Sequence, residues 1–214
     1  MNSQIEHSTT SSSESNRLLR SVMAGPTDER MNNGISQNSR TGGITVSWAQ
    51  HLDEVREAQR LRYQVFAMEM GATLPKTIEG HDIDLFDHYC EHLIVRDEAS
   101  REVIGTYRVL TPAQAKRVGS TYSDPEFDLT RLRSMREQMV ELGRSCVHAD
   151  HRHGGVIMAL WGALGKFMVR NQLDTMMGCA SIPMLHNGVA SGDVAASIWT
   201  KIKTTHLAPI EHHV

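Results

Sequence analysis

The first clear pattern is helical. Between residues 49 and 68, apolar positions recur every three or four residues, the spacing of one helix face. These positions are Leu52, Val55, Ala58, Leu61 and Val65. Just before them, residues 44–48 alternate between apolar and polar side chains, as in a short strand. The folded part is therefore predicted to begin near residues 42–43 with a strand followed by a helix.

The downstream pattern predicts further strands and helices. Strands over residues 90–96 and 103–110 flank a polar connection, which favours an antiparallel hairpin. Thr111 and Pro112 are typical of a helix start and predict a short helix to Val118, and Asp128 or Thr130 caps another through Arg136. Residues 138–147, 155–172 and 175–182 predict a strand, a helix and a strand. This order indicates a mixed α/β (α+β) fold with a βαβ unit, and residues 194–202 are compatible with a further helix.

The N-terminal 43 residues have a different composition. They contain 9 Ser, 4 Thr and 5 Asn and no aromatic residue. Such a segment buries too little apolar surface to offset its ordering entropy. We predict a disordered tail over residues 1–43 and one domain over residues 44–214.

Composition excludes several protein classes. The 214 residues contain three cysteines, too few and odd in number for a disulfide scaffold, which favours a reducing compartment. A formal charge of −3 argues against a nucleic-acid partner. No apolar run reaches the roughly 20 residues needed to cross a bilayer, and the N-terminus lacks a secretory signal. We therefore expect a cytoplasmic protein.

The loop at residues 148–155 joins a predicted strand to a long helix and is rich in donors. Arg152 and three histidines precede Gly154 and Gly155. Free N–H groups at a helix start attract anions, so a phosphate group fits here, although an ordinary basic turn is an alternative.

Several short motifs together resemble a known family. They are Leu61–Phe66 (LRYQVF), Asp82, Asp84 and Asp87, Gly105–Arg108 (GTYR), and Glu141–Val147 (ELGRSCV). As a set they resemble bacterial ornithine N-acyltransferases of the GCN5-related N-acetyltransferase (GNAT) superfamily, which are related to acyl-homoserine-lactone synthases. The resemblance spans about residues 44–182. It implies a GNAT fold, with a central, mostly antiparallel sheet, splayed parallel strands and flanking helices.

The resemblance also implies an activity. A (3-hydroxy)fatty acyl group would move from acyl carrier protein to the α-amino group of ornithine, the first step of ornithine lipid synthesis. Acyl-phosphopantetheine would be a co-substrate rather than a resident cofactor, and no metal is expected. A lipid product suggests peripheral contact with the inner membrane. Proteins of this family continue past a segment like His206–Pro209, so the resemblance implies that this chain is short at its C-terminus.

The acceptor amine needs a general base, and Glu141 is our candidate. A carboxylate buried in the middle of a strand is uncommon and is typical of a functional site. The alternative for Glu141 is a salt bridge to Arg144 or Arg108. A β-bulge at Gly143 would bring Glu141 and the second candidate catalytic residue, Arg144, to one side of the strand. Backbone N–H groups freed at this bulge could polarise the thioester carbonyl.

The remaining candidates would bind the substrates. Asp82 and Asp84 could bind the amino groups of ornithine, and Arg62 and Arg108 its carboxylate or these aspartates. Structural ion pairing is the rival interpretation for both arginines. The resemblance adds Phe66 to this acceptor site. The residues expected to bind the phosphopantetheine thioester are Val147, Arg152, His153, Gly154 and Gly155.

Two other functions remain open. One is an acyl-homoserine-lactone-type signal synthase, and the other is a non-catalytic module that binds acyl carrier protein or an acyl chain. Zinc binding by Cys146 and the nearby histidines, and catalysis by Cys146, are less well supported than a buried structural cysteine. On the 155–172 helix, core packing is favoured over an acyl groove for five apolar residues: Met158, Leu160, Trp161, Leu164 and Met168.

Overall fold

The computed structural model describes residues 43–74, 78–182, 184–186 and 189–214. The predicted disordered tail over residues 1–43 lies outside this part of the chain, apart from Gly43. The division into a tail and a domain over residues 44–214 therefore stays a prediction.

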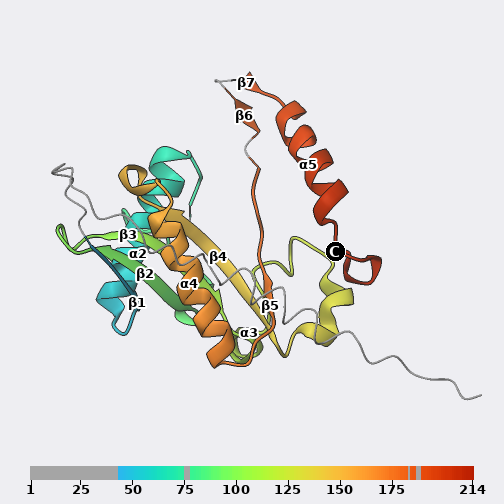
Figure 1. The fold of residues 1–214 in the computed structure, drawn as a ribbon, viewed down its shortest axis with the longest axis horizontal. Helices are drawn as coiled ribbons and strands as arrows, with labels where there is room; N and C mark the ends of the chain where they lie inside the picture. The colour runs from blue at the N-terminus through green and yellow to red at the C-terminus, as the bar shows by residue number, and fades with distance from the viewer. Residues whose placement is uncertain (1–42, 75–77, 183, 187–188) are drawn as a thin grey trace, which may run out of the picture. The chain divides into compact units, whose positions relative to one another are not determined.

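A five-stranded sheet forms the centre of the described chain (Figure 1). Its strands are β1 (Ile44–Trp48), β2 (Glu91–Asp97), β3 (Val103–Leu110), β4 (Met139–Val147) and β5 (Thr175–Met177), and they lie in this order across the sheet. All neighbours pair antiparallel except β4 and β5, which pair parallel. The predicted mixed sheet, the β2–β3 hairpin and the βαβ unit are confirmed.

Two helices cover opposite faces of the sheet. Helix α4 (Gly155–Arg170) packs with Leu160 and Leu164 on the face that carries Leu93 and Val95 of β2. Helix α2 (Leu52–Tyr63) packs with Ala58 and Leu61 on the other face, against Ile94 and Val103. Neighbouring residues of β2 thus point into different clusters, as strand geometry requires.

Capping residues determine where the short helices begin. Thr111 accepts a hydrogen bond from the Gln114 N–H and starts α3 (Pro112–Val118), as predicted. Asp128, rather than Thr130, caps the next helix through the Thr130 N–H. This helix, Leu129–Met135, is 3-10 rather than α. The predicted 49–68 helix begins at Leu52, and its last turns, Gln64–Glu69, are π-helical.

The prediction of a strand over residues 175–182 is wrong beyond Met177. A Cβ on Gly178 would lie 2.5 Å from the Leu142 carbonyl oxygen, so the chain passes tightly against β4 there. Pairing with β4 stops at Met177, and without a pairing partner the strand cannot continue.

Beyond β5 the chain forms a small hairpin and a last helix. The two-residue strands β6 (Leu185–His186) and β7 (Val189–Ala190) pair antiparallel and were not predicted. Helix α5 (Asp193–His206) contains the predicted 194–202 segment and has no buried residue. The helices that the structure describes include none long and apolar enough to cross a membrane.

The packing of α4 on the sheet gives a stability prediction. Leu164 is 1% exposed, so Leu164→Ala should lower the free energy of unfolding by about 2–5 kcal/mol through lost burial and a cavity. Val169→Ala, on the same helix at 81% exposure, should change it by less than about 0.5 kcal/mol. Urea denaturation measures both, and equal effects would contradict this placement of α4.

Candidate active site

A β-bulge interrupts β4 in the middle of the sheet. Thr106 pairs with Cys146 and Arg108 with Gly143, so β4 uses one residue more than β3 between these pairs. Arg144 lies inside this interval with φ of 52°, a left-handed conformation that is uncommon outside glycine. The predicted bulge is therefore present, and its left-handed residue is Arg144, next to Gly143.

The parallel strands β4 and β5 separate soon after they meet. They pair at three positions, the last of which is Glu141 with Met177. Strand β4 continues to Val147, so residues 142–147 have no partner on the β5 side. Gly178 packs against the Leu142 carbonyl, and beyond it the backbone groups of residues 143–147 on that side of β4 have no strand partner among the described residues.

Glu141 lies where the two strands separate and is 6% exposed. Its Oε1 accepts hydrogen bonds from the Ser123 N–H at 2.8 Å and the Ser123 hydroxyl at 2.5 Å. Its Oε2 accepts one from the Tyr122 N–H at 2.6 Å. Among the described residues it forms no ion pair, so the alternative of a salt bridge to Arg144 or Arg108 does not hold.

Arg62 is the centre of a buried ionic network. Its guanidinium makes a bidentate pair with Asp87, at 2.8 and 2.9 Å, and its Nε lies 2.9 Å from Asp82 Oδ2. The side chains of Arg62, Asp82 and Asp87 are 1%, 0% and 2% exposed. His92 Nε2, 3.0 Å away, donates to the Asp87 carbonyl.

Two further arginines extend this network toward the bulge. Arg108 Nη1 lies 2.6 Å from Asp84 Oδ1. Arg144 lies 3.1 Å from Asp82 Oδ2 and 3.3 Å from Asp84 Oδ2, and its guanidinium stacks 5.1 Å from the Tyr122 ring centre. Three arginines thus face three aspartates, and the formal charges balance within the buried cluster.

The network shifts the pKa of its members. Burial raises the pKa of Asp87, but hydrogen bonding to Arg62 and the charges of Arg62 and Arg108 outweigh burial and leave the pKa below its usual value. Burial also lowers the pKa of His92. Asp87 is therefore ionised at neutral pH, and His92 is neutral.

A small cavity lies between this network and Glu141. Its volume of about 20 Å³ is close to the space that one water molecule needs. Its lining residues are Phe86, Cys90, Arg108, Leu110, Tyr122, Glu141, Leu142 and Gly143. Burial raises the pKa of the Cys90 thiol to about 12, so this group is a neutral thiol.

The loop before α4 offers backbone N–H groups at the end of β4, where the strand has no partner on the β5 side. We call the region between β4 and the chain after β5 the split. Gly154, with φ of 100°, is the N-cap, and a Cβ on Gly154 or Gly155 would meet no atom within 4 Å. Arg152 donates to the Val147 carbonyl at 2.9 Å and pairs with Glu69 at 2.6 Å. His153 is exposed. The helix start is therefore open to a ligand.

The structure brings some predicted residues together and leaves others apart. Glu141 and Arg144 both contact Tyr122, and Arg144 and Arg108 share Asp84. Phe66 packs instead against the hydrophobic cluster under α2. Arg62 and Asp82 are so buried in mutual ion pairs that they can orient other residues but offer no surface to a substrate.

Sequence reasoning missed several residues of the site. Asp87 was part of the motif set but received no role. Tyr122 and Ser123 lie in a connection without periodicity, and no sequence signal links them to Glu141, which is 18 residues further on. Cys146, considered as a nucleophile, is buried, and burial raises its pKa to about 12. The described residues include no cluster of three or more potential metal ligands.

Comparison with known proteins shows which family model and which solved structure this chain is similar to. Residues 61–162 match the family model of the acetyltransferase (GNAT) domain. A CoA-dependent acyl-homoserine lactone synthase has a similar structure, with a TM-score of 0.50 and 16% identity over 75% of this chain and 90% of that one. At this identity the likeness shows the fold alone. Residues 61–162 of this chain are thus similar to a GNAT domain.

The chain is also similar in sequence to curated proteins of one name. The L-ornithine N(alpha)-acyltransferase of Rhodobacter capsulatus is 38% identical over 143 residues, which are 64% of this chain and 55% of the relative. The protein of that name from Brucella abortus is 36% identical over 160 residues, 69% of this chain and 57% of the relative. The chain therefore spans little more than half the length of the curated relatives it matches.

The buried network gives a prediction. Arg62→Met leaves Asp82 and Asp87 without their main partner, so it should lower the free energy of unfolding by about 3–5 kcal/mol. Arg60→Met removes an exposed arginine of the same helix and should cost less than about 0.5 kcal/mol. Chemical denaturation compares the two, and a similar cost for both variants would show that Arg62 does not stabilise the fold through these pairs.

Proposed function

We propose that this protein is an N-acyltransferase that moves a fatty acyl group from an acyl carrier protein thioester to the α-amino group of ornithine. The observation that carries the proposal is that, just after Glu141, residues 143–147 of β4 have no strand partner on the β5 side. This leaves a row of unpaired backbone groups between a buried carboxylate and an open helix start. The names of the curated relatives support ornithine as the acceptor.

The thioester would lie along β4, in the split. Its phosphate would bind the free N–H groups at Gly155 and the next residues of α4, with Arg152 and His153 beside them. Val147, whose carbonyl holds Arg152, fixes the position of that guanidinium. An acyl carrier protein brings this phosphate on its phosphopantetheine arm, and the exposed Arg131 and Arg133 could meet its acidic face.

The acceptor amine would approach the thioester from the side of Glu141. The cavity admits one water, so Glu141 would take a proton from the acceptor's ammonium group through that water. Asp84 is the least buried carboxylate of the network, with a side chain 15% exposed, and is suited to bind a second amino group. Asp82 and Arg62 would hold Arg144 and Asp84 in place.

The neutral amine nitrogen would then attack the thioester carbonyl carbon. The negative charge on the carbonyl oxygen would be stabilised by β4 N–H groups near the bulge, where Arg144 departs from regular pairing. Collapse of this intermediate breaks the carbon–sulfur bond, and the leaving thiolate takes up the proton that the acylated nitrogen releases. The products are an N-acyl amino acid and the free phosphopantetheine thiol.

Glu141→Gln tests this assignment. The amide keeps the size of the side chain but cannot accept the proton, so kcat should fall by about 10²–10⁴ while the KM for acyl carrier protein stays within about twofold. The measurement is steady-state release of carrier thiol with ornithine as acceptor.

Glu137→Gln is the matched control, because Glu137 is exposed and its only ion pair among the described residues is with Lys116. Its kcat should equal that of the wild type. A folded Glu141→Gln variant with wild-type kcat would show that Glu141 is not the base. No turnover by the wild-type chain with loaded carrier protein and ornithine would refute the proposed activity itself.

The donor site can be tested separately. Arg152→Ala removes a cation beside the open helix start, so the KM for acyl carrier protein should rise about tenfold with little change in kcat. Arg101→Ala, at an exposed turn between β2 and β3, is the control and should leave KM unchanged. An unchanged KM in Arg152→Ala would place the phosphate elsewhere.

A further inference from the structure

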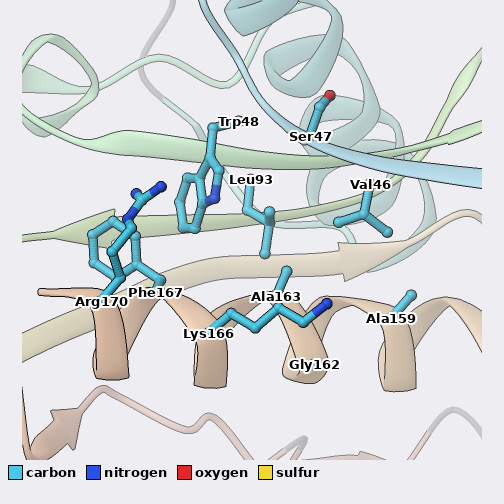
Figure 2. Close-up of a pocket in the computed structure, with 10 residues that line it drawn as sticks. All are labelled: Val46, Ser47, Trp48, Leu93, Ala159, Gly162, Ala163, Lys166, Phe167 and Arg170. Carbon is cyan, nitrogen blue, oxygen red and sulfur yellow. The ribbon is translucent and has the colours of Figure 1, made fainter.

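A second hollow lies on the α4 side of the sheet, away from Glu141. It has a volume of about 500 Å³ and runs between β1 and α4 (Figure 2). Its lining residues are Val46, Ser47, Trp48, Leu93, Ala159, Gly162, Ala163, Lys166, Phe167 and Arg170. It shares none of them with the cavity beside Glu141. We call it the β1–α4 groove.

Small side chains on α4 keep this groove open. Ala159, Gly162 and Ala163 form the helix wall, and a Cβ on Gly162 would have no neighbour within 4 Å. Trp48 stacks on Phe167 with ring centres 4.6 Å apart and closes one end. From Ala159 to Arg170 the wall is roughly 16 Å long at 1.5 Å per residue. These dimensions suit an extended hydrocarbon chain.

The charge at the groove is of one sign. Arg170 lies beside Phe167 and Trp48, and the side chain of Lys166 extends along α4 toward Ala163, as Figure 2 shows; neither forms an ion pair with any residue that the structure describes. None of the lining residues is acidic, and the sequence of α4 contains no Asp or Glu. The groove therefore offers an apolar path with two cations on its α4 side, complementary to an amphiphile with an anionic head.

Exposed apolar side chains also lie on the two elements that form the groove. Met158 and Val169 on α4 are 70% and 81% exposed, and Ile44 and Val46 on the edge strand β1 are more than a third exposed. Ile44, Val46 and Trp48 share one face of β1 because side chains alternate along a strand. A single dissolved amphiphile needs only the groove. An apolar rim beside it, with basic residues, fits a lipid surface.

We propose that the β1–α4 groove and its rim form a docking surface for an anionic lipid bilayer, with one lipid acyl chain in the groove and its head group beside Lys166 and Arg170. The lysine and arginine stems can lie along apolar surface while their charges reach the head groups. This surface is independent of the proposed acyl transfer, since it uses no residue of that site.

The test is binding of the full chain to vesicles. Phosphatidylcholine vesicles containing 30% phosphatidylglycerol should bind the wild type, and phosphatidylcholine vesicles alone should bind it much more weakly. Lys166→Gln with Arg170→Gln removes two cations and should lower the partition coefficient on anionic vesicles by about 10- to 30-fold. Flotation or sedimentation measures the bound fraction.

Helix α5 supplies the matched control. It also carries exposed apolar residues and two lysines, Lys201 and Lys203. Lys201→Gln with Lys203→Gln removes the same charge and should change the partition coefficient by less than twofold. A larger loss in this α5 variant than in the α4 variant would overturn the proposal.

A second measurement locates the acyl chain. Lipids brominated on their acyl chains quench tryptophans that contact the chains, so the wild type should be quenched. Trp48→Phe should lose much of this quenching, and Trp199→Phe on α5 should keep it. Quenching that is lost with Trp199 but not with Trp48 would contradict the groove. Wild-type binding to monomeric laurate but not to anionic vesicles would also contradict the proposal, in favour of a free amphiphile.

Discussion

The ion pairs of Arg62 with Asp82 and Asp87 are the constraint on which the site depends. A buried guanidinium is costly unless carboxylates surround it, so α2 and the 82–88 segment must meet at this point. Asp82 then reaches Arg144 at the bulge, and Asp84 reaches both Arg144 and Arg108. The network thereby connects α2, β3 and β4, and it fixes side chains around the cavity before any substrate arrives. Such preorganisation is what electrostatic catalysis requires.

Strand β4 combines two departures from regular pairing. On its β3 side the bulge turns Arg144 toward the network, and on its β5 side the pairing ends at Glu141. Neither departure alone would make a site, because a regular β4–β5 ladder would leave no room for a thioester. Together they place a buried carboxylate at the point where the strands separate. The hydrogen bonds from Tyr122 and Ser123 hold that carboxylate in position.

The sequence predicted those helices and strands whose position depends on one apolar face or on one helix-capping residue. Helix α2, the β2–β3 hairpin and the Thr111 cap follow from periodicity and local hydrogen bonding, and all were predicted. The length of β5 could not be predicted, because it depends on pairing with β4, which stops at Met177, rather than on its own residues. The same holds for the site. The motif residues around Glu141 were identifiable from the sequence, but its hydrogen-bond partners lie in an irregular connection. Only their burial in the structure shows that Arg62 and Asp82 are inaccessible to a substrate.

The central claim is that the split between β4 and β5 receives an acyl-phosphopantetheine. Its most direct test is a titration of the labelled protein with a non-reactive amide analogue of acyl-phosphopantetheine, followed by backbone amide NMR shifts. The account predicts the largest shifts for residues 142–147 of β4 and for Gly155 and Val156 at the start of α4. Shifts confined to other regions, with these amides unchanged at saturation, would contradict it.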